Sequence, residues 1–478
     1  MSGAATLEDR LGAAESIAVA RRALGAEEDA WIVGGAVRNA ILGEEVADAD
    51  LAVPAGREQD AARAIAGESG GVAFALSERH ATWRAIESGK GWHVDVTALR
   101  APRIEDDLRQ RDFTVNAVAV ALAGGEPVDP TGGVSDAERR TLRATAEEAL
   151  LADPLRLLRA PRIAAAHSLE IDPVTQVMIG SLAPSAADAA GERQLAELRQ
   201  MIGGPEPMRS LSLMQALGLT PVVLPELAAT RGVIQNPNHH LDVHDHTLAV
   251  LGEWLSIEAD LESFDAAQAD RIEEFLAEPL ADEMSRGQAL RWGALFHDLG
   301  KPDTREEREG TVTFIGHDRV GAELIEGICR RLRTSRALSD HLQGLALHHL
   351  RLGFMIWERP LGLERVYDYL RATEPVGADV TLLSVSDRLA ARGSGPLASE
   401  EMVGAHLDVA REMLAEALAW HAEPPRPPLS GEELRAELGV EPGPRMGEIL
   451  ERLRAAAFAG EVPDRASAMA LARRLASE

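Results

Sequence analysis

The stretch WIVGGAVRN, residues 31–39, is followed by DADLAV, residues 48–53, and these two segments decide the fold. A short apolar run before two glycines is typical of a β-strand that turns directly into a helix. Gly34 and Gly35 at such a turn leave backbone N–H groups facing outward, where they can bind phosphate oxygens. An ordinary turn can carry the same glycine pair, and the third glycine of the dinucleotide-binding fingerprint is missing.

Acidic and apolar residues alternate in the second segment. Asp48 and Asp50 are two positions apart, so both carboxylates lie on one face of a strand. Two acids on one face repel each other unless a cation lies between them, and rigidly held carboxylates suit Mg²⁺. A later segment, WHVDVT (92–97), offers Asp95 as a third carboxylate, although an alternating strand can place an aspartate there without any catalytic role.

Strand-like segments are concentrated between residues 28 and 128, whereas Ala, Leu, Glu and Arg recur at helical spacing from about Leu142 onward. The sequence therefore predicts an α+β protein with a small mixed-sheet head and a mostly α-helical remainder. PPRPPLSGEEL, from Pro424, predicts a stiff linker that ends in a helix capped by Ser430 and Glu433. The predicted parts are an N-terminal helix (1–27), the head (28–140), a helical neck and body (141–230), a helical domain rich in His and Asp (231–400) and a helical tail (401–478).

The composition limits the kinds of partner. With 49 basic and 77 acidic residues, the net charge of −28 has the wrong sign for binding nucleic acid by bulk attraction. Cys329 is the single cysteine, so any metal must be held by His and carboxylate side chains. No apolar run approaches the roughly 18 residues of a membrane span, and the N-terminus lacks the pattern of a signal peptide. These features predict a cytoplasmic protein with no membrane partner.

Three further segments follow the glycine pair and the two aspartates in order: EDDLRQRDFTVNAVAV (105–120), VDPTGGVSDAERRTLRAT (128–145) and ADPLRLLRAPRIAAA (152–166). From residue 30 to about 230 the chain resembles the class II tRNA nucleotidyltransferase and bacterial poly(A) polymerase family. The resemblance implies that Asp48 and Asp50 hold catalytic Mg²⁺. It also implies nucleotide contacts, mainly to triphosphate and ribose, from Gly34, Gly35, Arg38, Arg111, Asp112, Asn116, Arg159 and Arg162.

Asp153 and Arg156 are three positions apart on a predicted helix, where they could also form an ordinary salt bridge. Beside a nucleotide they can select the base, because aspartate only accepts and arginine only donates hydrogen bonds. Cytosine and adenine present an exocyclic amino group beside an unprotonated ring nitrogen, whereas uracil and guanine present the reverse. The pair therefore favours CTP and ATP without a nucleic-acid template.

The sequence departs from the family pattern at Asn39, Gln110 and Ala152, none of which is a predicted metal ligand. Another departure is that only ten residues separate Arg100 from Arg111. Family members that complete the CCA triplet carry a longer flexible segment there, which is associated with the switch from C to A. The short connection resembles the CC-adding subgroup, which leaves the last adenosine to a separate A-adding enzyme.

A second set of motifs lies between residues 244 and 392. HDHTLAVL, GALFHDLGKP, IGHDRVGAELI, GLALHHLRL and LLSVSDRLAAR resemble the ordered ligands of the HD phosphohydrolase superfamily. The resemblance implies an unidentified divalent metal and water activation for attack on a phosphoester. A helical domain that keeps these residues for packing is the alternative. The implied ligands are His246, His297, Asp298, Asp387, His317 and His348, and the sequence leaves open whether His348 or the adjacent His349 faces inward.

The predicted function is template-independent addition of CMP, as CC or the full CCA, to the 3′ end of tRNA from CTP and ATP. Two rivals share the same motifs. One is poly(A) polymerase, and the other is an HD phosphohydrolase whose head serves only as an RNA-binding module. The tail resembles the last segment of the family, which implies a contact with tRNA.

Overall fold

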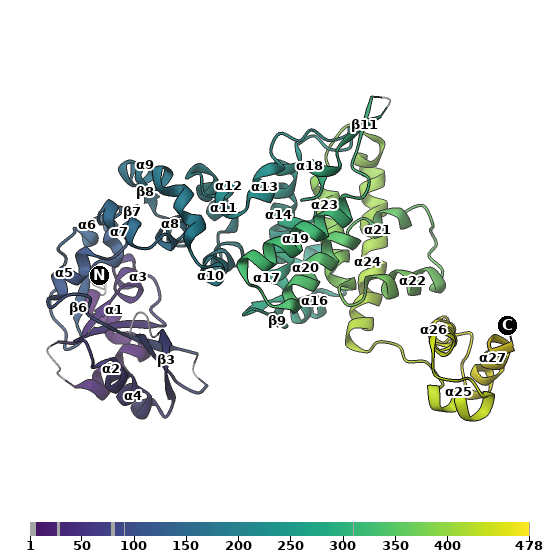
Figure 1. Ribbon diagram of the computed structural model, residues 1–478, viewed down its shortest axis with the longest axis horizontal. Helices are drawn as coiled ribbons and strands as arrows, with labels where there is room; N and C mark the ends of the chain where they lie inside the picture. The colour runs from purple at the N-terminus through teal and green to yellow at the C-terminus, as the bar shows by residue number, and fades with distance from the viewer. Residues whose placement is uncertain (1–5, 26–28, 78–81, 90, 309, 478) are drawn as a thin grey trace. The chain divides into compact units, whose positions relative to one another are not determined.

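The computed structural model describes residues 6–25, 29–77, 82–89, 91–308 and 310–477. The chain divides into two compact units, Met1–Val223 and Leu224–Glu478, coloured purple to teal and teal to yellow in Figure 1. The predicted N-terminal segment 1–27 is described only from residue 6 to residue 25, and the rest of that prediction lies outside the described residues. The described part forms two helices, α1 (Leu7–Ala13) and α2 (Glu15–Leu24).

Unit 1 begins with a six-stranded mixed sheet in the order β3-β4-β5-β2-β1-β6. The pair β2–β5 is parallel and the other neighbouring pairs are antiparallel. The strands predicted from alternation are present, and the predicted α+β class is confirmed. The strands are β1 (Trp31–Val33), β2 (Ala49–Val53), β3 (Val72–Ser77), β4 (Thr82–Ile86), β5 (His93–Ala98) and β6 (Ala119–Ala121).

The two faces of this sheet differ. Ile32, Leu51 and Val94 point to one face and are buried in a core with α2 and α4 (Glu58–Ser69). On the other face, a smaller core joins Val33 and Ala52 to α5 (Ile104–Arg109). Since side chains alternate along a strand, Asp48 and Asp50 share this second face with Ala52. The predicted metal ligands therefore lie on the face that carries the smaller core.

The rest of unit 1 is mainly helical, with only the short parallel pair β7 (Thr141–Leu142) and β8 (Glu170–Ile171). A 3₁₀ turn, η1 (Thr114–Asn116), precedes β6. The helices are α3 (Gly35–Leu42), α6 (Gly133–Glu138), α7 (Glu147–Ala152), α8 (Leu155–Ala166), α9 (Pro173–Leu182), the 3₁₀ helix η2 (Ala183–Asp188), α10 (Gly191–Ile202), α11 (Pro207–Ala216) and α12 (Thr220–Val223).

Unit 2 is built almost entirely from helices, as the 3.6-residue spacing predicts. The predicted capping box of Ser430 and Glu433 is present and starts α25. Among the described residues, no helix combines the length and the apolar character that a membrane span needs. The helices of the middle part are α13 (Pro225–Ala229), α14 (Val243–Ala259), α15 (Leu261–Asp265), α16 (Ala269–Ala277), α17 (Arg286–Phe296), α18 (Lys301–Thr304), α19 (His317–Leu332), α20 (Arg336–His348), α21 (Arg351–Met355), α22 (Leu363–Thr373) and α23 (Gly377–Ala390).

The last helices of unit 2 are α24 (Glu400–Ala422), α25 (Gly431–Leu438), α26 (Pro444–Phe458) and α27 (Arg465–Ser477), and a 3₁₀ turn, η3 (Pro396–Ala398), precedes them. The last three form a small core of their own around Leu434, Ile449 and Leu453. Two short antiparallel pairs complete the unit. They are β9 (Pro279–Ala281) with β10 (Met284–Ser285), and β11 (Glu306–Arg308) with β12 (Thr311–Thr313).

Candidate active site and metal centre

The turn between β1 and α3 needs its first glycine. Gly34 has φ +68°, and a Cβ placed there would lie 2.8 Å from Oδ2 of Asp50. Only glycine avoids both the strained backbone and this contact. Because residue 34 has no Cβ, the backbone N of Gly35 can lie 3.4 Å from the same oxygen of Asp50. The glycine pair therefore brings the N-terminus of α3 directly against a predicted metal ligand.

The carboxylates form an array with two cations. Asp50 and Asp95 are partners in the parallel β2–β5 register, and burial together with the charge of Asp95 raises the pKa of Asp50. Arg84 forks onto Asp95, with Nε–Oδ1 at 2.6 Å and Nη2–Oδ2 at 2.7 Å. His93 lies 2.9 Å from Asp48 through Nδ1, and although burial opposes the shift, this partner lowers the pKa of Asp48.

This arrangement fits a divalent cation. Asp50 is held in a rigid sheet two positions after Asp48, and burial beside Asp95 raises its pKa. Carboxylate oxygens are the ligands that Mg²⁺ prefers. Asp95 already accepts two hydrogen bonds from Arg84. Its predicted role as a third metal ligand therefore stays a prediction.

The predicted triphosphate contacts come together beside these acids. Arg38 Nη1 donates to Asn116 Oδ1 at 2.8 Å, and Arg159 Nη1 lies 2.8 Å from Oδ2 of Asp112. Asn116 in turn donates to Asp112 Oδ1 at 3.1 Å. Burial and the nearby Arg162 and Arg159 lower the pKa of Arg38 to about 10. A buried guanidinium with further guanidinium groups around it is a site that an anion would stabilise.

The other predicted cations are held by acids. Arg111 Nε donates to Asp107 at 2.9 Å, and its Nη1 would lie 3.7 Å from a Cβ at Gly34. Arg162 Nε donates to Glu197 of α10 at 2.5 Å. Arg111 is therefore beside the glycine turn, whereas Arg162 is oriented by the neighbouring helix.

Asp153 and Arg156 line one pocket of about 880 Å³ between the sheet and α8 to α10. Asp153 lies at the break between α7 and α8 with extended backbone, so the prediction that it sits within a helix is wrong. Pro154 at the next position disfavours helical backbone at Asp153, which explains the break. Arg156 Nη1 donates to the carbonyls of Gln110 and Ala149, both at 2.9 Å.

Arg193 of α10 holds the Asp153 carboxylate with two hydrogen bonds of 3.1 and 2.7 Å. Although burial opposes it, this pairing lowers the pKa of Asp153. The carboxylate therefore stays ionised and can accept further hydrogen bonds. Arg193 belongs to none of the family motifs that contain Asp153, so this contact was not predictable from the sequence.

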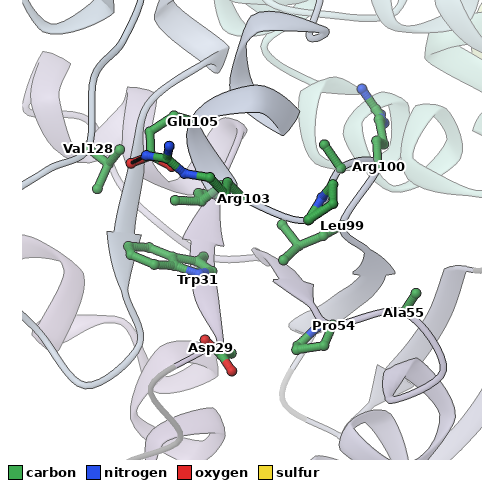
Figure 2. Close-up of a pocket in the computed structure, with 12 residues that line it drawn as sticks. Asp29, Trp31, Pro54, Ala55, Leu99, Arg100, Arg103, Glu105 and Val128 are labelled. Atoms are coloured by element: carbon green, nitrogen blue, oxygen red, sulfur yellow. Dashed lines mark hydrogen bonds and ion pairs between the residues drawn. The ribbon is translucent and has the colours of Figure 1, made fainter.

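Figure 2 shows a second pocket in unit 1, of about 690 Å³, with Trp31 and Leu99 on its walls and Arg100 and Arg103 near its rim. It lies near α5, whose residues Ile104 and Leu108 pack over the sheet beside Val33. Leu99 and Arg100 line both pockets, so the connection from β5 to α5 separates them. The predicted base-selecting pair lines only the other pocket.

In unit 2, two groups of possible metal ligands lie together. They are His246 with His297 and Asp387, and Asp298 with His317 and His349. Asp298 connects the groups: its Oδ2 is 3.1 Å from His297 Nε2, and its Oδ1 is 3.4 Å from His317 Nε2. His246 Nε2 lies 3.0 Å from Asp387 Oδ1.

Three of the histidines are oriented in the same way. The Nδ1 atoms of His297, His317 and His349 lie 2.6–2.8 Å from the carbonyl three residues earlier, which assigns the proton to Nδ1. Their Nε2 atoms face Asp298, and in the neutral Nδ1–H tautomer that metal-binding histidines use, Nε2 carries the lone pair that binds a cation. His317 and His349 bring these atoms to 3.3 Å from each other. Oδ1 of Asp298 is buried without a hydrogen-bond partner, which also fits a cation in this cluster.

The structure corrects one predicted ligand. His349 is buried in the cluster, while His348 lies outside both groups and accepts a hydrogen bond from Arg351 Nε at 2.9 Å. His348 ends α20, and a one-residue step there turns a side chain to a different direction. Lys301 was not predicted as part of this cluster, and its buried Nζ lies 2.6 Å from Asp298 Oδ2. Its position three residues after Asp298 is a spacing that allows an ion pair on a helical turn.

Three family models match successive parts of the chain. The model of the poly A polymerase head domain matches residues 30–143, the probable RNA and SrmB-binding site of polymerase A matches residues 168–230, and the HD domain matches residues 274–392. An A-adding tRNA nucleotidyltransferase of Deinococcus radiodurans is 37% identical over 94% of this chain and 96% of its own. The chain belongs to the class II tRNA nucleotidyltransferase family.

A second relative of this nucleotidyltransferase is a CC-adding and not an A-adding enzyme. The CC-adding tRNA nucleotidyltransferase of Thermus thermophilus is 33% identical over 93% of both chains. The fold also matches solved structures. The Thermotoga maritima CCA-adding enzyme complexed with tRNA superposes with a TM-score of 0.57 at 18% identity, covering 97% of this chain and 94% of that one. The Bacillus stearothermophilus CCA-adding enzyme in complex with CTP gives 0.58 at 22% identity and 96% of both chains.

Proposed function

We propose that this nucleotidyltransferase adds two cytidines to the 3′ end of tRNA from CTP, without a nucleic-acid template. The observation that carries the proposal is the joint placement of acids, cations and base-selecting groups in unit 1. Arg159 lines the pocket of Asp153 and Arg156, and it also pairs with Asp112 beside Arg38. A triphosphate on these cations lies next to the carboxylates of β2, and its base faces Asp153.

Base selection follows from hydrogen-bonding capacity. The ionised Asp153 accepts from the amino group of cytosine, and Arg156 donates to the ring nitrogen. Arg193 keeps the carboxylate ionised and limits its rotation, since it binds both oxygens. Uracil presents a carbonyl to Asp153. Two hydrogen-bond acceptors, this carbonyl and the carboxylate, would then face each other without a proton between them, which opposes the binding of UTP.

The chemical step is an attack of the RNA 3′ hydroxyl on the α-phosphorus of CTP, with release of pyrophosphate. Mg²⁺ held by Asp48 and Asp50 would supply positive charge at the hydroxyl and at the leaving group. The backbone N–H of Gly35 and the guanidinium of Arg38 bind and orient the triphosphate. Asp112 and Asn116 keep Arg38 and Arg159 in place through the contacts of 2.8 to 3.1 Å.

The short connection between β5 and α5, residues 99–103, supports CC addition rather than completion of CCA. In the family this position carries the segment associated with the switch from C to A. A separate enzyme would then add the terminal adenosine. Because one of the two relatives above is an A-adding enzyme, A addition to a CC end is the outcome to test against.

The test uses purified protein with tRNA that ends at the discriminator base, at C or at CC. Each RNA is incubated with CTP, ATP, UTP or GTP separately. We expect CMP on the first two RNAs and no AMP on the third. AMP addition to the CC end would contradict the CC assignment, long adenosine tails would indicate poly(A) polymerase, and Asp48→Ala with Asp50→Ala retaining extension would contradict the site.

We also propose that the His and Asp cluster of unit 2 is a phosphohydrolase site. It is supported by the Nε2 atoms directed at Asp298 and by the contact of 3.3 Å between His317 and His349. Hydrolysis of a nucleoside 2′,3′-cyclic phosphate and of p-nitrophenyl phosphate, with Mg²⁺, Mn²⁺, Ni²⁺ or Zn²⁺ added singly, tests it. We expect His349→Ala to abolish hydrolysis and to leave CMP addition unchanged. No hydrolysis with any of these ions would contradict the proposal.

A further inference from the structure

The catalytic face of the head sheet continues beyond the aspartates to an exposed apolar edge. Directly paired residues of neighbouring strands have side chains on the same face. The register pairs Phe74 with Arg84, Arg84 with Asp95, and Asp95 with Asp50. One row of side chains therefore runs across four strands from Phe74 on the edge strand β3 to a predicted catalytic carboxylate.

A second row runs beside the first. Val72 pairs with Ile86, and Ile86 pairs with His93, whose ring contacts Asp48. The two rows place Val72 and Phe74 on the catalytic face, whereas Ala73 packs with the opposite core. The apolar residues of β3 are therefore directed toward the side where nucleotide transfer is proposed.

This end of the face is open. Val72 is 58% exposed and Phe74 42% exposed, and Leu76, at an irregularity of the β3–β4 pairing, is 46% exposed. Three apolar side chains in one strand are an unusual exposed patch, and such patches mark interaction sites. Pocket residues Thr82 and Thr97 lie between this patch and the base-selecting pair.

We propose that the exposed face of β3 binds the unpaired 3′ end of the RNA substrate, with a base stacked on Phe74. The inference rests on the proposed function, because it assigns a place to the RNA that the reaction extends. Three strand spacings separate Phe74 from Asp50, so the distance is about 14 Å, or about four stacked nucleotides. A stacked base suits an exposed aromatic ring beside an active site, and it needs no particular sequence.

A second copy of the chain fits this patch less well. Pairing between edge strands uses N–H and C=O groups in the plane of the sheet, not the side chains on its face. The patch is instead continuous with the carboxylates through Arg84 and Asp95. This continuity favours a ligand whose end must reach Asp48 and Asp50.

The test compares Phe74→Ala, Phe74→Tyr and a control, Phe354→Ala, in which a 65% exposed aromatic residue of α21 is truncated. KM for tRNA and KM for CTP are measured in CMP addition. We expect Phe74→Ala to raise KM for tRNA at least about fivefold, since a stacked base contributes about 1 kcal/mol or more, with KM for CTP unchanged. Phe74→Tyr keeps the ring and should stay within about twofold of the wild type.

Two outcomes separate this inference from the proposed function. A wild-type protein that extends no RNA would overturn the proposed function, whereas equal KM values for Phe74→Ala and Phe354→Ala in an active enzyme would overturn only the stacking. A changed sedimentation coefficient of Phe74→Ala without a change in KM would identify a protein interface and also overturn it. If Phe74→Ala fails to fold, 4-thiouridine at the 3′ end of the RNA should crosslink wild-type protein within residues 72–77, and a crosslink elsewhere would contradict the inference.

Discussion

Replacing Gly34 with alanine should both strain the backbone and displace a carboxylate of the active site. Gly34 has φ 68° and ψ −131°, a conformation that costs a side-chain-bearing residue about 1–3 kcal/mol. The new Cβ would also lie 2.8 Å from Asp50 Oδ2, whereas ordinary contacts begin at 3.4 Å. The carboxylate must move by the difference, 3.4 minus 2.8, or about 0.6 Å. Since a displacement of about 1 Å can cost about a hundredfold in rate, we expect kcat for CMP addition to fall roughly tenfold to a hundredfold.

Gly25 provides a matched control. Its φ of 65° and ψ of −145° nearly equal those of Gly34, but an added Cβ would meet nothing within 4 Å. Both variants should therefore lose similar stability, measured as the free energy of unfolding in urea, while only Gly34→Ala loses activity. Single-turnover CMP addition at saturating CTP and RNA gives the rate. Equal rates for the two variants would refute the argument that Gly34 is required for the approach of α3 to Asp50.

Three further predictions concern contacts that the sequence did not reveal. His349→Ala should lower the metal content of the purified protein by elemental analysis, and His348→Ala should leave it unchanged; the reverse would contradict the assignment of His349. Arg193→Ala removes two hydrogen bonds from Asp153, so we expect kcat/KM for CTP to fall about tenfold and discrimination against UTP to weaken. Lys301→Met leaves the buried Asp298 without its closest cation, so metal-free protein should lose about 3–5 kcal/mol of stability, and added metal should restore part of it. A melting temperature equal to that of the wild type in EDTA would contradict this role.

The sequence predicts those features that depend on local spacing. Alternation of apolar residues identified the strands, and it placed Asp50 on the same face of β2 as Ala52, with Asp48 directly before the strand. The capping box at Ser430 was predictable because both partners lie within four residues. The family motifs supplied the order of the head residues. They carry no distances, so the exchange of hydrogen bonds among Arg38, Asn116 and Asp112 emerged only from the structure.

Contacts between distant segments were not predictable. Arg193 lies forty positions after Asp153, and Arg84 reaches Asp95 only because β4 and β5 pair in one particular register. The choice between His348 and His349 stayed open for a different reason. Adjacent residues of a helix differ by about 100° in direction, and the phase of the last turn is set by how α20 ends.

The hydrogen bonds from the histidine Nδ1 atoms to carbonyls three residues earlier have a consequence for how the cluster of unit 2 assembles. Each bond closes within one turn of the chain, so the ring directions of His297, His317 and His349 are fixed by local backbone geometry. Removal of the ion by a chelator would then leave the nitrogen donors in their binding directions. A new ion could bind there without any change in the surrounding helices. Exchange of one ion for another at this centre should accordingly be quick and leave the far-ultraviolet circular dichroism spectrum untouched.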